Sequence, residues 1–174
     1  MTRYVAFLRG INLGASNKIA MPKLRAMAER LGYADVRIYI NSGNLLFTSS
    51  RTDLALTQDI HSAIKSEFGY TIDVAVRTED QLRRILKENP YPDGDPSQVT
   101  VAFLTEKPPA TAKDKVAAIA TDQEPFTIAG TEVWVNYTQG LARSKLAAQF
   151  SKIIGVSATV RNVRTVGKIV AMLD

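Results

Sequence analysis

Two short polar motifs, one near each end of the chain, carry the side chains best suited to chemistry. They are Arg9-Gly-Ile-Asn12-Leu-Gly14 and Arg161-Asn162-Val-Arg164-Thr165. Each follows a run typical of a β-strand, and neither residues 1–28 nor residues 140–173 contain Asp or Glu. Guanidinium groups and amide groups bind oxyanions through charge-assisted hydrogen bonds. The pattern therefore predicts an anionic ligand, and it specifies no reaction.

The segment 10–20 is rich in glycine and asparagine and is expected to join a strand to a helix. Such a loop offers backbone N–H groups and a helix N-terminus to phosphate. Arg9 and Lys18 favour this interpretation, although the Gly-Lys-Ser/Thr of a P-loop is missing. The alternative is that the glycines only permit a tight, irregular connection.

The segment Asn41-Ser42-Gly43-Asn44 has the composition of a hairpin turn. A second interpretation is that Ser42 and Asn44 present hydrogen-bonding groups beside the first loop. In a ferredoxin-like half, we expect this turn and the 10–20 loop to lie at opposite ends of the sheet. That expectation counts against one shared site.

Two helix starts are predicted in the last part of the chain. Ser144 is expected to cap one helix, and Asn162 or Thr165 is expected to cap the last one. Cations crowd both starts, where the helix dipole disfavours positive charge unless an anion binds. These cations are Arg143, Lys145, Arg161, Arg164 and Lys168.

An internal repeat predicts the architecture, because Val5-Ala6-Phe7-Leu8 recurs as Val101-Ala102-Phe103-Leu104. The hydrophobic periodicity around each copy predicts the order β-α-β-β-α-β followed by one more helix. We therefore predict an α+β protein of two ferredoxin-like βαββαβ halves in tandem, each followed by a helix. The expected first half is 1–89, the Pro- and Asp-rich linker is 90–97 and the second half is 98–174. A single irregular α+β domain is the alternative.

Several of these stretches together resemble a known family, the bacterial domain of unknown function 1697. The resemblance rests on Leu8–Gly14, Lys18–Met21, Tyr39–Asn44, Arg143–Leu146 and Ala158–Asn162. It implies a bacterial α+β protein with paired ferredoxin-like halves and no assigned activity. The chain departs from the family pattern at Ala15, Asn41, Val163 and Arg164, where glycine, glutamine, tryptophan and asparagine are usual. The missing tryptophan removes a possible stacking surface, and Arg164 adds positive charge.

Composition narrows the class of protein. A hydrophobic content of 45% with 22% charged residues is ordinary for a globular protein, and a net charge of +5 favours anionic partners. The chain has no cysteine and no apolar run long enough for a signal peptide or a membrane span. We expect a cytoplasmic protein with no membrane association, no metal site and no cofactor. The single histidine, His61, is not a favoured general base.

The leading hypothesis is a cytoplasmic protein that binds an anionic, phosphate-bearing ligand, either a small molecule such as a nucleotide or a nucleic acid. The alternatives are a protein-interaction module and a small-molecule enzyme that acts by electrostatic positioning. No catalytic residue is assigned. The predicted ligand-binding residues are Arg9, Asn12, Lys18, Ser42, Asn44, Ser144, Lys145, Arg161, Asn162 and Thr165.

Overall fold

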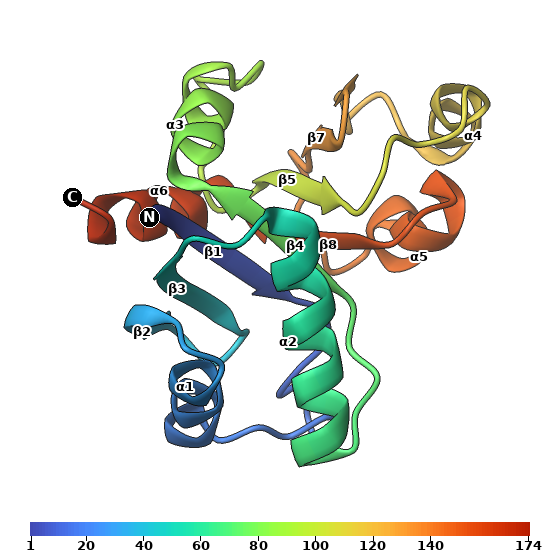
Figure 1. The fold of residues 1–174 in the computed structure, drawn as a ribbon. Coiled ribbons are helices and arrows are strands. Elements are labelled where there is room, and N and C mark those ends of the chain that lie inside the picture. Colours follow the sequence, from blue (N-terminus) through green and yellow to red (C-terminus); the bar gives the residue numbers. More distant parts are fainter. The chain divides into compact units, whose positions relative to one another are not determined.

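The computed structural model describes all residues from Met1 to Asp174 and contains two four-stranded antiparallel sheets and six helices (Figure 1). The elements in chain order are β1 (Thr2–Leu8), α1 (Met21–Arg30), β2 (Ala34–Tyr39), β3 (Asn44–Ser49), α2 (Asp53–Phe68), β4 (Val74–Thr78), α3 (Glu79–Lys87), β5 (Val99–Leu104), α4 (Ala112–Ile119), β6 (Phe126–Ala129), β7 (Glu132–Asn136), α5 (Lys145–Ile154), β8 (Ala158–Asn162) and α6 (Val163–Met172). The predicted α+β class is confirmed, and this order is consistent with two tandem halves.

The two sheets repeat one topology. Their strand orders are β2-β3-β1-β4 and β6-β7-β5-β8, so the two copies of Val-Ala-Phe-Leu lie in equivalent strands, β1 and β5. The registers match as well, because Phe7 lies opposite Asn44 and Phe103 lies opposite Glu132. The sequence repeat is therefore a repeat of structure.

The contacts divide the chain into two compact units, which are described separately below. Unit 1 comprises residues 1–84 and 169–174, and unit 2 comprises residues 85–168. Both divisions fall inside a helix that follows the last strand of a sheet, α3 in one case and α6 in the other. Compared with the predicted halves, unit 1 therefore gains the end of α6, and the linker 90–97 lies in unit 2.

In unit 1, α1 and α2 cover one face of the sheet (Figure 1). Alternate residues of β1, namely Tyr4, Ala6 and Leu8, belong to the same buried cluster as Leu24 of α1 and Ile60 of α2. This is the period-two burial expected of a strand that packs against helices. The apolar stripe of α1 follows from its sequence, since Leu24, Met27 and Ala28 recur at helical spacing.

In unit 2, α4 and α5 contribute to a corresponding core. Ala102 and Leu104 of β5 share a buried cluster with Val116 of α4 and with Leu146 and Phe150 of α5. Both units therefore use the same arrangement, with two helices on one face of an antiparallel sheet.

The helices α2 and α5 also begin and end in the same way. Thr52 and Ser144 each accept a hydrogen bond from the backbone N–H three residues ahead, at 3.3 and 3.1 Å. Gly69 and Gly155 end the helices with φ of 77° and 83°, a conformation that glycine adopts without steric cost. The prediction that Ser144 is an N-cap is confirmed.

β2 stops at Tyr39, because Ile40 has a φ of +54° that is incompatible with a strand. One strand end differs from the prediction. β8 extends through Arg161 and Asn162, which were predicted to follow the strand.

The turn at Gly43 generates a stability prediction, with Gly14 as a matched control. Both residues have positive φ, 85° and 58°. A Cβ at Gly43 would lie 2.5 Å from Ile11 Cδ1 and 3.0 Å from Leu8 Cβ, whereas one at Gly14 would meet nothing within 4 Å. Gly14→Ala should lower the free energy of unfolding by about 1–2 kcal/mol, the cost of the left-handed conformation. Gly43→Ala should cost about 1–3 kcal/mol more, because it overpacks a buried region.

Urea unfolding of both variants measures this difference. Equal losses for the two glycines would contradict the close packing of Gly43 against Ile11 and Leu8.

Candidate functional site

Asn12 joins the 10–20 loop to the 40–43 turn. Its side-chain amide donates to the carbonyl oxygens of Ile19 and Asn41 at 3.0 and 2.9 Å, and its Oδ1 accepts from the Ile19 amide at 2.8 Å. The φ of Asn12 is +55°, which asparagine tolerates better than most residues. The side chain therefore fastens two segments of the predicted site to each other.

This contact corrects the expectation that the loop and the turn lie at opposite ends of the sheet. β3 runs antiparallel to β1, so its first residue, Asn44, pairs with Phe7 near the end of β1. The turn before β3 must then lie where β1 ends and the loop begins, and the Leu8 amide donates to the Gly43 carbonyl at 2.9 Å. We call this region, the loop 9–20 together with the turn 40–43, the loop end of unit 1.

The cations of the loop end are only partly neutralised. Arg9 forms an exposed ion pair with Asp73, with Nη1 3.3 Å from the carboxylate oxygen. An exposed pair of this kind is weak and its partners separate readily. Lys18 is exposed and makes no ion pair in the structure. The loop end thus retains positive charge available to an anion.

Two apolar side chains at the loop end face solvent. Leu13 and Ile40 are 66% and 50% exposed, and they adjoin the two residues of the Asn12–Asn41 hydrogen bond. Ile40 is also a β-branched residue with positive φ, which is strained. Strain in an exposed residue is a feature that clusters at binding sites.

Ser42 and Asn44 have local structural contacts. Asn44 is fully buried, and its Nδ2 donates to the Tyr39 carbonyl at 2.9 Å and to Ser42 Oγ at 3.2 Å. These contacts support the hairpin-turn interpretation, since both side chains shape the turn. Ser42 keeps some exposure at the loop end, whereas Asn44 does not.

In unit 2, Ser144 has two partners. Its hydroxyl caps α5 and also donates to the carboxylate of buried Glu124, whose other oxygen accepts from the Thr121 amide at 3.0 Å. Burial, with a smaller effect of the Glu124 charge, raises the pKa of neighbouring Tyr137. Lys145 follows Ser144 in the first turn of α5 and is exposed.

The other predicted residues of unit 2 lie at the junction of β8 and α6. Asn162 Oδ1 accepts from the Thr165 amide at 2.8 Å, so Asn162 is the residue that caps the last helix. Arg161 is partly buried, its Nη1 donates to the Val160 carbonyl at 3.0 Å, and burial lowers its pKa to about 10. Four cations near the two helix starts are exposed, namely Arg143, Lys145, Arg164 and Lys168.

Arg161 has an equivalent in unit 1 that the sequence did not single out. Arg77 pairs with Val5 as Arg161 pairs with Val101, and Arg77 also donates through Nη1 to the preceding carbonyl. Both arginines lie on the sheet face opposite the helices, because Val5 and Val101 alternate with the residues of the helix-facing cores. The arginine is therefore a feature of the repeat.

The two motifs occupy different ends of their sheets. The loop end lies where β1 finishes, whereas Asn162 pairs with Thr100, near the beginning of β5. In unit 1 the matching position is Thr78, which pairs with Tyr4. The two groups of predicted residues are thus not equivalent sites of the repeat.

A cavity of unit 1 contains none of the predicted residues. It has a volume of about 600 Å³ and lies at the other end of the sheet, where β1 begins. Its charged lining consists of Arg3, Arg25, Arg37, Glu29, Asp35 and Asp174. These residues come from β1, α1, β2 and the chain end, so no single motif could have identified them.

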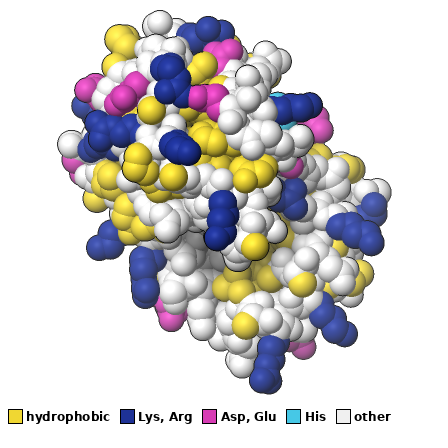
Figure 2. Space-filling model, turned by 90° about the horizontal axis from the view of Figure 1, so that it is seen from below, with side chains coloured by type: hydrophobic (Ala, Val, Ile, Leu, Met, Phe, Trp, Pro, Cys, Tyr) yellow, Lys and Arg dark blue, Asp and Glu magenta, His cyan; other side chains and the backbone are white.

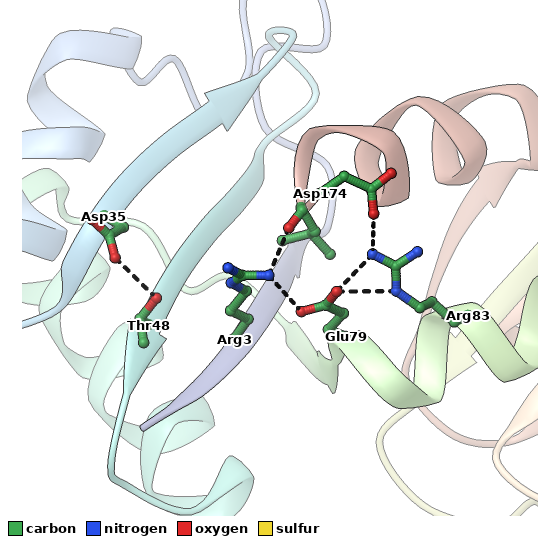
Figure 3. Close-up of polar contacts among 7 residues, drawn as sticks. Arg3, Asp35, Thr48, Glu79, Arg83 and Asp174 are labelled. Carbon is green, nitrogen blue, oxygen red and sulfur yellow. Dashed lines mark hydrogen bonds and ion pairs between the residues drawn. The ribbon is translucent and has the colours of Figure 1, made fainter.

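A network of ion pairs adjoins this cavity (Figure 3). Arg3 Nη1 lies 3.2 Å from Glu79 and 2.8 Å from the Leu173 carbonyl, and Arg83 contacts both Glu79 and Asp174. Hydrogen bonding to Arg83, and then to Arg3, holds the pKa of Glu79 below its ordinary value. The network fastens residues 173–174 to β1 and α3.

Charge is dispersed over the face of the molecule that Figure 2 draws. In Figure 2 the Lys and Arg side chains stand mostly apart from one another on the face that is drawn, without one continuous basic patch. None of the helices is both long and apolar enough to cross a bilayer.

The Asn12 contacts generate a prediction. Asn12→Gly keeps the positive φ accessible but removes three hydrogen bonds, so unfolding should become easier by about 1–3 kcal/mol. Asn17→Gly is the control, since Asn17 has a φ of +49° and one side-chain bond, to the Gly10 carbonyl at 3.2 Å. It should lose less stability. Hydrogen exchange of the Ile19 backbone amide should accelerate only in the Asn12 variant. Similar exchange rates in both variants would contradict the role of Asn12 in holding the loop against the turn.

The lowered pKa of Glu79 predicts a pH dependence. A carboxylate whose pKa is lowered by folding stabilises the protein above its ordinary pKa, and this contribution disappears as the pH falls through the folded pKa. Glu79→Gln should therefore destabilise the protein at pH 7, and its difference from wild type in urea unfolding should shrink below about pH 4. Glu29→Gln removes an exposed pair with Arg25 and should have a smaller effect at pH 7. A difference for Glu79→Gln that is constant with pH would refute the ionic role.

Comparisons with known proteins agree with the fold. No curated protein matches the chain. Its structure is similar to that of a conserved bacterial protein from Streptococcus pneumoniae, with a TM-score of 0.75, 24% sequence identity and 99% of each chain covered. At this identity the similarity shows the fold alone. A family model matches residues 1–134, and the chain therefore belongs to the family described as protein of unknown function, DUF1697.

Proposed function

We propose that the loop end of unit 1 binds an anionic, phosphate-bearing ligand, and that the protein is a cytoplasmic binding protein. The observation that carries this proposal is the set of hydrogen bonds from the Asn12 side chain. They join the loop and the turn into one surface beside Arg9 and Lys18. We also propose that each half is ferredoxin-like, which is supported by the shared β-α-β-β-α-β order and by two helices on one sheet face.

The chemistry of the loop end supports an oxyanion. Lys18 offers an unpaired ammonium group, and Arg9 can exchange its exposed carboxylate partner, Asp73, for a ligand. Gly10 and Gly14 have positive φ, as do Asn12 and Asn17, and such loops turn backbone N–H groups toward a bound anion. In this arrangement Asn12 positions the loop while the two cations contact the ligand.

The exposed apolar residues favour a nucleotide or a nucleic acid over an inorganic ion. Leu13 and Ile40 would contact a base or a sugar while the cations contact its phosphate. If the protein is an enzyme, these groups would act by electrostatic stabilisation and positioning. Ser42 is proposed to contribute its hydroxyl, and Asn44 supports the turn.

The predicted residues of unit 2 form a second candidate. Lys145 is exposed, while Ser144, Asn162 and Thr165 take part in helix caps. The proposal for this group is a weaker anion contact through Lys145, with the capped start of α5 supplying backbone N–H groups. Arg161 lies on the opposite face of the sheet and would make a separate contact.

The test uses the full chain with AMP, inorganic phosphate and a single-stranded RNA oligomer at two salt concentrations. Lys18→Ala should weaken binding of AMP or RNA about tenfold, the value of about 1.5 kcal/mol for one charge-assisted hydrogen bond. Lys65→Ala, a change to an exposed lysine of α2, should leave affinity unchanged. Calorimetry or a thermal-shift assay measures the affinities of the two variants.

The outcomes separate the functional classes. A steep loss of affinity with salt identifies a nucleic-acid binder through counterion release, and weak salt dependence identifies a small-molecule site. A protein that none of the three ligands stabilises would refute the proposal and leave the protein-interaction module. Equal effects of Lys18→Ala and Lys65→Ala would move the site away from the loop end.

A further inference from the structure

The cavity at the beginning of β1 has the features of a separate binding site. Its volume of about 600 Å³ lies within the range of small-molecule pockets. Its walls come from β1, α1, β2, β3 and the chain end, all of which belong to unit 1. It shares no residue with the loop end.

Three arginines from three elements line this cavity. Arg3 and Arg25 each use part of their guanidinium group, in pairs with Glu79 and Glu29, and both remain more than half exposed. Arg37 makes no side-chain hydrogen bond or ion pair. A guanidinium group carries five N–H donors, so all three arginines retain N–H groups that can donate hydrogen bonds to an oxyanion.

A bulge in β2 contains Asp35, one of the three acidic residues that line the cavity. Ala34 pairs with Thr48 and Arg37 pairs with Leu46, so β2 contains one residue more than its partner over this stretch. Asp35 in the bulge has a φ of +51°. Bulges of this kind redirect side chains and are common beside binding sites.

Asp35 makes no ion pair within the cavity lining. Its Oδ2 accepts from Thr48 Oγ1 at a long 3.5 Å, and Figure 3 shows the two side chains directed at each other. Glu29 and Asp174 are each occupied by an arginine. Asp35 and Thr48 therefore offer an acceptor and a hydroxyl to a ligand that carries hydroxyl groups.

We propose that this cavity binds a small hydroxylated oxyanion, either a sugar phosphate or a hydroxy acid. Its phosphate or carboxylate pairs with Arg37 and with the free donors of Arg3 and Arg25. Its hydroxyl groups donate to Asp35 and contact Thr48. Bidentate geometry makes arginine the preferred partner for both kinds of anion. This site is independent of the function proposed for the loop end.

The test measures binding of ribose 5-phosphate, glycerate and neutral ribose to the full chain by calorimetry and NMR. One of the two anions should bind saturably and shift the amide signals of Arg37 and Thr48, and ribose should not. Binding of ribose 5-phosphate would identify the ligand as a sugar phosphate, and binding of glycerate would identify it as a hydroxy acid. Arg37→Ala should weaken that binding at least about tenfold, and Arg25→Ala should weaken it as well.

Two controls locate the ligand. Arg84→Ala changes an exposed arginine outside the cavity and should leave affinity unchanged. Lys18→Ala should also leave it unchanged, because Lys18 belongs to the loop end. Binding that is lost in Lys18→Ala and kept in Arg37→Ala would overturn the cavity proposal and support the loop end. No saturable binding of either anion would also overturn it, without bearing on nucleotide or RNA binding at the loop end.

Discussion

Burial of the central strand over both faces is the constraint on which each unit depends. Tyr4–Leu8 of β1 and Val99–Leu104 of β5 are buried at every position, and Tyr4 and Thr100 are the only residues among them that carry a hydroxyl. An unpaired polar group at these positions would cost a large desolvation penalty, so the strands consist of apolar residues. Arg77 and Arg161 satisfy part of their donor capacity locally, at the carbonyls just before them. Polar chemistry is therefore confined mainly to the strand ends.

The two ends of the unit 1 sheet are closed by different physical means. At the loop end, neutral hydrogen bonds of Asn12 hold the 10–20 loop against the turn, and the nearby cations remain exposed. At the other end, the ionic network around Glu79 fastens the chain end beside the cavity. Hydrogen bonds between neutral groups persist in salt, whereas exposed ion pairs are screened. Ionic strength therefore acts more strongly on the cavity end than on the loop that presents Arg9 and Lys18.

Local sequence patterns predicted the helices and strands well. They did not predict contacts between residues that are far apart in the sequence. Periodicity located every helix and strand in order. Capping chemistry identified Ser144 and left Asn162 and Thr165 as alternatives for the last helix, of which the structure selects Asn162. The end of the sheet at which the turn lies depends on the direction of β3 relative to β1, which residue types alone do not reveal. Asp73 neutralises part of Arg9 from 64 residues away, so the acid-free stretch 1–28 overstated the local charge. The cavity was missed because five segments build it.

Unit 2 serves as an internal control for the importance of the loop end. The connection between β5 and α4 occupies the position of the 10–20 loop, and it reads Thr105-Glu-Lys-Pro-Pro-Ala-Thr111. It contains no glycine or asparagine, none of its residues has positive φ, and it includes an acidic residue, Glu106. The same scaffold thus closes its sheet without the features of the loop end. Gly10, Asn12, Gly14, Asn17 and Lys18 are therefore not required by the scaffold itself, which favours a role for them in binding over a purely structural one.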